Sequence, residues 1–291
     1  MTPTDRVLLN NRLELPPIGF GTYDIYDDKV LQQAMDAGYT LFDNAPNYAN
    51  LEQMGKALSA SGKREDLFLI EKVETWEQPY GAKKAVKNCL QKTGQNYFDM
   101  YLMHFPHPDY YLKTWREMEM IYQSGIVRSI GVCNFGVEQL ERLLQKARVV
   151  PAVNQIELHP LFPQKETVQF CKQNGIRVMA YSPLARMDRR LFDDPTLLAI
   201  AQSHQKSIAQ VILRWNIQSG FIPIPKTTSY ARMQHNLELF DFCLSDQEMA
   251  RIDAMDCNGR IRKDPNDPTI YPAKPALHSV LKVKLLDLLT R

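Results

Sequence analysis

Short apolar runs alternate with longer helical stretches along most of this chain, and this alternation limits the possible folds most strongly. Near-continuous apolar runs are typical of strands that are buried on both faces of a parallel sheet. Because strands that alternate with helices imply right-handed crossovers, the sheet is predicted to be parallel. Eight such units over about 240 residues favour an α/β fold of the single-domain (β/α)8 TIM barrel type over a doubly wound sheet. The predicted strands are residues 18–22, 40–42, 67–73, 99–104, 129–134, 152–158, 177–181 and 221–224, and the predicted helices are 28–37, 52–61, 81–93, 114–123, 137–145, 165–174, 196–204 and 207–218.

The N-terminal stretch precedes the first strand of this repeat. Residues 7–15 are predicted to form a short β-hairpin, with Asn10 and Asn11 in its turn, that closes the bottom of the barrel. Gly19 and Gly21 follow, but the third glycine of a Gly-x-Gly-x-x-Gly fingerprint is missing. A Rossmann dinucleotide site is therefore disfavoured.

No linker and no shift in composition divides the chain before about residue 258. We therefore expect a single domain over residues 1–291, with a barrel core at 7–258 and a tail at 259–291. The tail begins as a proline-rich segment. Its leucine-rich end, residues 276–291, is predicted to be an amphipathic helix that packs on the barrel.

Charge and cysteine content exclude several classes of protein. The 35 Lys and Arg against 33 Asp and Glu give a net charge of +2, which offers no electrostatic reason to bind nucleic acid or acidic membranes. No apolar run is long enough to span a bilayer and no signal peptide is recognised, so we expect a cytoplasmic protein. The 5 cysteines are scattered and the 6 histidines form no His-x-x-x-His pair, which argues against disulfides and against a metal centre.

Four polar residues lie at the ends of adjacent predicted strands or just beyond them: Asp43, Tyr48, Lys72 and His104. Taken singly, each has an ordinary structural explanation: a capping residue, an exposed loop aromatic, a strand-edge lysine and a core histidine. In a barrel, however, the carboxyl ends of the strands converge on one face. Chance placement of all four at neighbouring strand ends is therefore a poor explanation.

These four side chains support one kind of chemistry. A tyrosine hydroxyl has a pKa near 10, and a nearby ammonium lowers that pKa. Asp43 would hold Lys72, Lys72 would lower the pKa of Tyr48, and His104 would orient a carbonyl oxygen or share its proton. No nucleophile or metal ligand set accompanies them. A proton donor without a nucleophile suits the reduction of a carbonyl by a hydride that a cofactor brings in.

Six motifs in the same order resemble the aldo-keto reductase family, and the resemblance covers residues 7 to about 258. Among its members, the chain is similar to the small bacterial and protozoan diketogluconate reductases and prostaglandin F synthases. The motifs are Ala37-Gly38-Tyr39-Thr40-Leu41-Phe42-Asp43-Asn44-Ala45-Pro46-Asn47-Tyr48, Met100-Tyr101-Leu102-Met103-His104-Phe105-Pro106, Ile130-Gly131-Val132-Cys133-Asn134-Phe135, Val153-Asn154-Gln155-Ile156-Glu157-Leu158-His159-Pro160, Tyr181-Ser182-Pro183-Leu184 and Ile224-Pro225-Lys226-Thr227.

The resemblance implies an NADPH-dependent reductase of aldehydes and ketones, with Tyr48 as the general acid of a tetrad with Asp43, Lys72 and His104. It implies that Asn134 and Gln155 hold the nicotinamide carboxamide. It also implies that Tyr181 stacks on the nicotinamide ring. The cofactor-binding residues it implies are Thr22, Tyr23, Asp43, Cys133, Asn134, Gln155, Tyr181, Ser182, Leu184, Lys226, Thr227, Ser229, Arg232 and Asn236, of which Lys226, Thr227, Ser229 and Arg232 would bind the 2'-phosphate.

The substrate pocket is predicted at the same face of the barrel. An aromatic-rich mouth there would suit an apolar or aromatic carbonyl compound. The residues expected to line it are Tyr23, Asn47, Trp76, His104 and Phe105, together with His107.

Four positions depart from the family's pattern. Asn44 replaces the usual Thr after the first Asp, and Leu51 stands where many members have Glu. Cys133 replaces the usual Ser, and a thiol is a weaker hydrogen-bond donor than a hydroxyl. His235 replaces the usual Glu near the adenine, so the contacts that bind the cofactor, and its affinity, are expected to differ here.

Two other functions are compatible with a barrel of this kind. One is a regulatory subunit that senses NADPH without turnover, which would call for an assembly surface; we expect a monomer instead. The other is a hydrolase or isomerase that uses Asp43 and Glu157 as paired carboxylates. Glu157 lies inside a predicted strand and is expected to be a structural hydrogen-bond acceptor.

Overall fold

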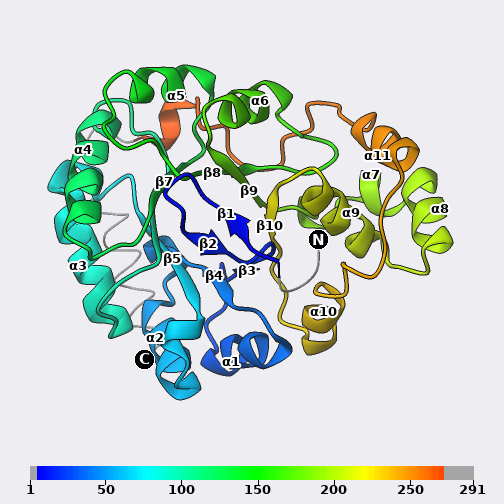
Figure 1. Cartoon of the computed structure of the whole chain (residues 1–291), viewed down its shortest axis with the longest axis horizontal. Coiled ribbons are helices and arrows are strands. Elements are labelled where there is room, and N and C mark those ends of the chain that lie inside the picture. Colours follow the sequence, from blue (N-terminus) through cyan, green and yellow to red (C-terminus); the bar gives the residue numbers. More distant parts are fainter. Residues whose placement is uncertain (1–4, 272–291) are drawn as a thin grey trace.

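Eight parallel strands follow one another in chain order around a single sheet (Figure 1). The computed structural model describes residues 5–271. Each predicted strand is present, and no end differs from the prediction by more than two residues. The strands are β3 (Phe20–Gly21), β4 (Leu41–Asp43), β5 (Phe68–Val73), β6 (Met100–Met103), β7 (Ile130–Cys133), β8 (Val153–Glu157), β9 (Arg177–Tyr181) and β10 (Ile222–Ile224).

Two backbone hydrogen bonds join the first and last strands of this sheet. The Gly19 amide donates to the Pro223 carbonyl at 3.0 Å, and the Gly21 amide donates to the Pro225 carbonyl at 2.9 Å. A Cβ on Gly19 would crowd the ends of the Leu41 and Ile224 side chains, so a larger residue there would force both to shift. These contacts close the sheet, and the predicted (β/α)8 barrel is confirmed.

The helices form a ring outside the strands, and every strand is followed by at least one of them (Figure 1). Local signals set their ends: α1 begins where the Asp27 side chain accepts from the Lys29 amide, and it ends at Gly38, which has φ 110°. None of the predicted helix ranges covers α7, α10 or α11, although Ser245 and Glu248 form a capping box at the start of α11. The helices are α1 (Asp28–Ala37), α2 (Leu51–Ser61), α3 (Ala82–Thr93), α4 (Tyr111–Gln123), α5 (Val137–Leu144), α6 (Lys165–Gln173), α7 (Arg189–Phe192), α8 (Pro195–Ser203), α9 (Ile208–Gln218), α10 (Tyr230–His235) and α11 (Asp246–Asp253).

The predicted N-terminal hairpin lies across the centre of the ring in Figure 1, with strands β1 (Val7–Leu8) and β2 (Glu14–Leu15). The Asn10 side chain donates to the Pro151 carbonyl at 3.0 Å, and Asn11 donates to the Arg128 carbonyl at 3.1 Å. Both acceptors precede strands, at the amino ends of β8 and β7. The hairpin therefore closes the bottom of the barrel, as predicted, and the site must lie at the opposite end.

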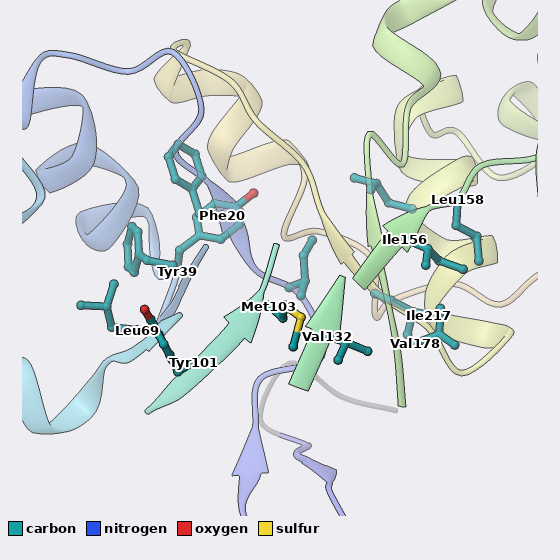
Figure 2. Close-up of a cluster of buried hydrophobic side chains, with 14 of the residues drawn as sticks. Phe20, Tyr39, Leu69, Tyr101, Met103, Val132, Ile156, Leu158, Val178 and Ile217 are labelled. Atoms are coloured by element: carbon teal, nitrogen blue, oxygen red, sulfur yellow. The ribbon is translucent and has the colours of Figure 1, made fainter. Parts of the chain in front are cut away.

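Side chains alternate between two apolar layers along each strand. Leu69 and Tyr101 point outward and pack between the sheet and the helices (Figure 2), whereas Ile70 and Leu102 fill the barrel interior with the hairpin. This alternation follows from the two-residue period of a strand. The interior layer is apolar at the bottom and gives way to polar side chains at the carboxyl ends.

After α11 the chain returns to the carboxyl end of the barrel and is fastened there by Glu157. The carboxylate of Glu157 accepts from the Ile261 amide at 2.6 Å and from the Arg262 amide at 2.9 Å. The segment then reaches Tyr271, the last residue described, whose ring lies 5.6 Å from that of His107. The helix predicted at 276–291 lies outside the described residues.

The contact between α2 and α3 supports β4 and β5, and it depends on Gly55. A Cβ on Gly55 would lie 2.5 Å from the carbonyl oxygen of Thr93, the last residue of α3. We expect Gly55→Ala to lower the free energy of unfolding by about 1–3 kcal/mol, although alanine is the better helix former by about 1 kcal/mol. Urea unfolding measures this change. The control is Ser59→Ala on the exposed face of α2, expected within about 0.5 kcal/mol of wild type; equal stability of both variants would contradict the close approach.

Candidate active site

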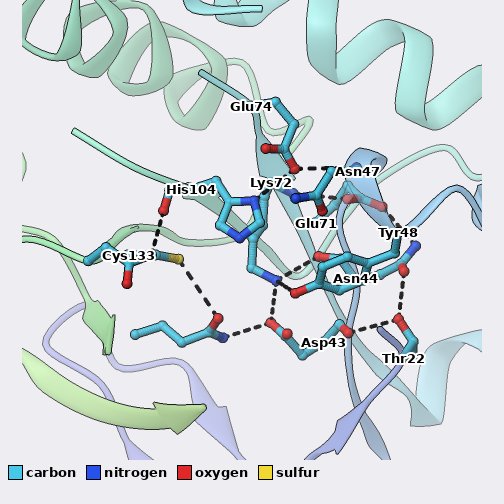
Figure 3. A network of polar contacts seen from close by, with 12 residues as sticks. Thr22, Asp43, Asn44, Asn47, Tyr48, Glu71, Lys72, Glu74, His104 and Cys133 are labelled. Carbon is cyan, nitrogen blue, oxygen red and sulfur yellow. Dashed lines mark hydrogen bonds and ion pairs between the residues drawn. The ribbon is translucent and has the colours of Figure 1, made fainter. Parts of the chain in front are cut away.

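A lysine whose side chain is fully buried lies at the centre of the polar cluster at the carboxyl end of the barrel (Figure 3). Lys72 comes from β5 and Asp43 from the neighbouring β4. The Lys72 ammonium donates at 2.8 Å to Asp43 Oδ1 and at 2.8 Å to the Asn44 carbonyl oxygen. Its third neighbour is the hydroxyl oxygen of Tyr48, at 3.3 Å. The three donor positions of the ammonium are thus all used within one small cluster.

These contacts determine which groups carry charge. Burial alone would lower the pKa of Lys72, but Asp43 and Tyr48 raise it more, so the pKa lies above its ordinary value and the ammonium persists. Lys72 lowers the pKa of Tyr48, as predicted, but the net shift of that pKa is upward. Burial raises the pKa of the phenol, and the opposing effect of Lys72 is too small to reverse it. The hydroxyl therefore keeps its proton in the cofactor-free protein.

A short 3₁₀ turn, η1 (Pro46–Tyr48), carries the phenol to this position. Ala49 ends the turn in the left-handed region, with φ 56°. The buried side chain of Asn50 then donates to the carbonyl oxygens of Thr22 and Ile25, at 2.8 and 2.9 Å. These bonds fasten the loop after β4, which carries Tyr48, to the loop after β3.

His104 follows β6 and completes the four predicted catalytic residues. Its ring lies 6.2 Å from the Tyr48 ring, edge to face. Its Nδ1 atom lies 2.7 Å from Oε1 of Glu74, and this carboxylate is also buried. The structure therefore brings the four predicted residues together and adds a carboxylate that the sequence reading did not identify.

A second unpredicted carboxylate lies behind the lysine. Glu71 is fully buried and accepts from the Lys72 amide at 3.0 Å and from the Asn44 side chain at 3.2 Å. Asn44 in turn accepts from the Thr22 hydroxyl at 2.6 Å. Burial raises the pKa of Glu71 to about 8. Asn44, which departs from the family's pattern, thus pairs through its side-chain amide with Glu71 on the neighbouring strand.

Amide side chains from the next strands border the cluster. Asn134 has φ 63° directly after β7, and its side chain donates to the His104 carbonyl at 2.9 Å. The Tyr181 hydroxyl donates to Asn134 Oδ1 at 2.8 Å. Gln155 donates to Asp43 Oδ1 at 2.7 Å. These residues, predicted to face the nicotinamide, lie in one hydrogen-bonded arc next to the four.

Cys133 lies inside this arc and is fully buried. Its Sγ atom is 3.9 Å from Gln155 Oε1, a long contact for a weak donor. Burial raises the pKa of the Cys133 thiol well above its ordinary value, so the sulfur stays protonated and able to donate.

The residues predicted to hold a 2'-phosphate follow β10 and lead into α10. The Arg232 guanidinium donates to Thr227 Oγ1 at 3.0 Å, and the same oxygen accepts from the Ser229 amide at 3.2 Å. Lys226 is exposed, and its ammonium lies 3.9 Å from the Asp24 carboxylate. Two cations and two hydroxyl groups thus share one small area of surface.

Asn236 and His235 lie at the far end of α10. Asn236 is buried, and its backbone amide donates to the Arg232 carbonyl at 3.0 Å. His235 is exposed. Asn236, which was predicted to contact the cofactor, is thus shielded from solvent, whereas the neighbouring His235 is accessible.

Aromatic rings lie beside Tyr48 and His104. The ring of Tyr23, which is 45% exposed, lies 5.2 Å from that of Tyr48. The Phe105 ring lies 5.2 Å from that of His104. Asn47 is exposed and precedes Tyr48 in η1, so three of the predicted pocket residues lie next to Tyr48 or His104.

Other predicted residues lie further from the four. His107 is buried and packs against Tyr271, which makes it a support for the returning chain. Trp76 is half-buried, and among residues 5–271 no ring contact or hydrogen bond connects it with the four. Ser182, with φ 48°, and Leu184 begin the loop after β9.

Glu74, Glu71 and Arg262 are the residues near the site that the sequence reading missed. Glu74 is two residues beyond Lys72, so the strand period places both on one face, and this signal was available. The Arg262 guanidinium lies 5.8 Å from the Tyr23 ring because the distant Glu157 holds the Arg262 backbone. No local pattern announces such a long-range contact.

Residues 5–271 hold no cluster of three potential metal ligands. In the same range no helix combines the length and the apolar character needed to cross a membrane.

Residues 17–256 match the model of the aldo/keto reductase family. This match spans more than half of the chain, and it covers every strand of the barrel and the four clustered residues. The protein therefore belongs to the aldo/keto reductase family and is an oxidoreductase.

Within that family the chain is similar to several bacterial and animal proteins. It is 40% identical to glyoxal reductase of Bacillus subtilis (strain 168), over 90% of this chain and 97% of the relative. It is 35% identical to methylglyoxal reductase of Escherichia coli (strain K12), over 87% and 94%. The crystal structure of an aldo-keto reductase from Bombyx mori in complex with NADP superposes with a TM-score of 0.85 at 35% identity, over 94% of this chain and all of that one.

The buried carboxyl of Glu71 predicts how stability depends on pH. Its pKa is about 8 in the folded protein against an ordinary value of 4.5, so folding favours its protonated form. The stabilising contribution is full at acid pH and is lost as the pH rises from about 5 to about 8. We expect Glu71→Gln, measured by urea unfolding at both pH values, to lose less stability than wild type over this range. The exposed Glu65→Gln control should lose as much stability as wild type. If Glu71→Gln also lost as much stability between the two pH values as wild type, the raised pKa would be contradicted.

Proposed function

We propose that this protein reduces aldehydes and ketones to alcohols with NADPH, and that Tyr48 is the general acid. The observation that carries the proposal is the Tyr48 hydroxyl oxygen, 3.3 Å from a buried ammonium that Asp43 holds in place. A proton donor held next to a fixed positive charge suits a reaction that ends with protonation of a developing alkoxide.

In this mechanism NADPH, when bound, supplies the hydride that reduces the carbonyl carbon. The Tyr48 hydroxyl gives its proton to the carbonyl oxygen as negative charge develops there. The Lys72 ammonium then stabilises the phenolate, because a positive charge at hydrogen-bond distance favours the ionised form. Asp43 does not touch the substrate; it keeps Lys72 oriented and charged.

The residues present fit this cofactor. The arc of Asn134, Gln155 and Tyr181 offers amide groups for a carboxamide and an aromatic face for a ring. Arg232 and Lys226 offer the charge that a 2'-phosphate requires, with the Thr227 hydroxyl between backbone and guanidinium. A guanidinium and an ammonium together favour a phosphate dianion over a ribose hydroxyl. We infer a preference for NADPH over NADH.

The substrate class follows from the mouth of the site and from the relatives. The names of the bacterial relatives specify glyoxal and methylglyoxal, which are small dicarbonyl compounds. Tyr23 and Phe105 provide apolar walls beside the proton donor. We therefore propose small aldehydes and dicarbonyls as substrates, with aromatic aldehydes also accepted.

Replacing Tyr48 with phenylalanine tests the general acid. We expect Tyr48→Phe to lower kcat by about 10²- to 10⁴-fold, because the proton donor is lost while the ring and its packing remain. NADPH oxidation with methylglyoxal and a nitrobenzaldehyde measures the rate, and fluorescence titration checks that NADPH still binds. The exposed Tyr26→Phe is the matched control and should retain activity. Full activity of Tyr48→Phe would contradict the role; NADPH binding without turnover by wild type would favour a sensor instead.

Removing one phosphate-site cation tests the cofactor preference. Arg232→Ala is expected to weaken NADPH binding by about ten- to hundredfold, since a hydrogen bond to a charged group contributes about 1.5–3 kcal/mol. NADH affinity should change little because it lacks the phosphate. Titration of both cofactors gives the two dissociation constants. Lys83→Ala, on the exposed face of α3, serves as the control for a lost surface charge; equal losses for NADPH and NADH would argue against a phosphate contact.

A further inference from the structure

Glu74 and His104 form a buried pair beside the proton donor (Figure 3). Glu74 is 2% exposed and His104 is 8% exposed. Their close contact joins Oε1 to the ring atom Nδ1, at 2.7 Å. The backbone amide of Asn47, in the loop that carries Tyr48, donates to the same oxygen at 3.4 Å. The carboxylate is therefore tied both to the histidine and to the tyrosine loop.

A carboxylate can only accept a hydrogen bond, and this fact decides how the histidine is protonated. Opposite an ionised Glu74, Nδ1 must carry a proton, because two acceptors that face each other at 2.7 Å would repel. A neutral ring would then present Nε2 as a lone pair. Only a ring that carries both protons offers an Nε2–H donor to a carbonyl oxygen.

We propose that Glu74 is the positioning residue of His104, and that the pair delivers a charged imidazolium whose Nε2–H binds the substrate carbonyl oxygen. This inference rests on the proposed carbonyl reduction. The Glu74 carboxylate balances the imidazolium charge, as Asp43 balances that of Lys72. Two buried ion pairs thus flank Tyr48, and the histidine keeps both protons while Tyr48 transfers its own.

Other charged and titratable groups surround this pair. Glu77 accepts from the Glu74 backbone amide at 3.0 Å; burial raises its pKa to about 8, so it adds little negative charge at neutral pH. The negative charge of Asp43 is balanced by Lys72. The charge of Glu74 also acts on Glu71 of the preceding strand and, from neighbouring elements, on Tyr48, Cys89, Tyr101 and Cys133.

The protonation state can be measured without any substrate. Nitrogen-15 NMR of the histidine ring in the full-length protein distinguishes a protonated Nδ1, a protonated Nε2 and a doubly protonated ring. We expect Nδ1 of His104 to carry a proton at neutral pH and the doubly protonated form to be populated there. In Glu74→Gln the doubly protonated form should be lost at neutral pH. A wild-type ring that is neutral at pH 7, protonated on Nδ1 alone or on Nε2 alone, would overturn the proposal.

The activity profile supplies the second measurement. At pH 7 we expect Glu74→Gln to lower kcat for methylglyoxal by about tenfold while the KM for NADPH stays the same, and to move the fall in activity toward lower pH by about one unit. Glu119→Gln is the matched control: it replaces another buried carboxylate whose Oε1 accepts from the Arg148 and Val149 amides, and an amide oxygen keeps both bonds. This control should keep the wild-type profile.

A double-mutant cycle separates a role through His104 from a general structural effect. In a His104→Asn background, Glu74→Gln should have little further effect on kcat, since its target is gone. Additive losses, or an unshifted profile in Glu74→Gln, would overturn the proposal. Should Glu74→Gln fail to fold, Glu74→Asp keeps the charge but withdraws it by one methylene. The losses of kcat and of the doubly protonated ring are then expected to be smaller than those predicted for Glu74→Gln. If the NMR result holds but wild type reduces no carbonyl, the Nε2–H role fails with the proposed function, while the Glu74–His104 pairing stands.

Discussion

The buried ion pair between Lys72 and Asp43 is the interaction on which the rest of the site depends. An ammonium that is removed from water is tolerated only where opposite charge and hydrogen-bond acceptors replace its hydration. Here Asp43, the Asn44 carbonyl and the Tyr48 hydroxyl fill those positions. Removing one partner of such a pair typically costs about 3–5 kcal/mol, so the geometry around Tyr48 is also a condition of stability. The barrel places the pair because β4 and β5 are neighbours in parallel register.

Much of this could be predicted from the sequence, because the governing rules are local or periodic. Alternating apolar runs and helices determine the order of the strands, and parallel strands in chain order bring their carboxyl ends together. That reasoning gathered Asp43, Tyr48, Lys72 and His104 from positions far apart in the chain, and the structure brings these four together. The N-terminal hairpin was equally accessible, since its turn residues and apolar ends are local signals.

What escaped prediction depends on burial and on distant partners. The effect of Lys72 on the phenol was predicted from proximity alone, whereas the desolvation of Tyr48 opposes it and is larger. Glu71 and Glu74 stand within an apolar strand and just beyond it, and only the packed barrel shows that they are buried and what they contact. Likewise Glu157 was expected to accept hydrogen bonds, but its donors lie about a hundred residues further along the chain. Such pairings are properties of the assembled fold.

The closure of the barrel between β3 and β10 has a consequence for the order in which the site can be built. The four clustered residues lie within residues 43–104, about a fifth of the chain, on or just beyond three successive strands of which each pairs with the next. The cations after β10 reach the same face only when the Gly19 and Gly21 amides bind the carbonyls of Pro223 and Pro225. During synthesis from the N-terminus, the proton-handling half can therefore assemble from nearby strands, while the phosphate-holding half must wait for the last strand to emerge. A folding intermediate that lacks this seam would carry a catalytic cluster but no complete cradle for the cofactor.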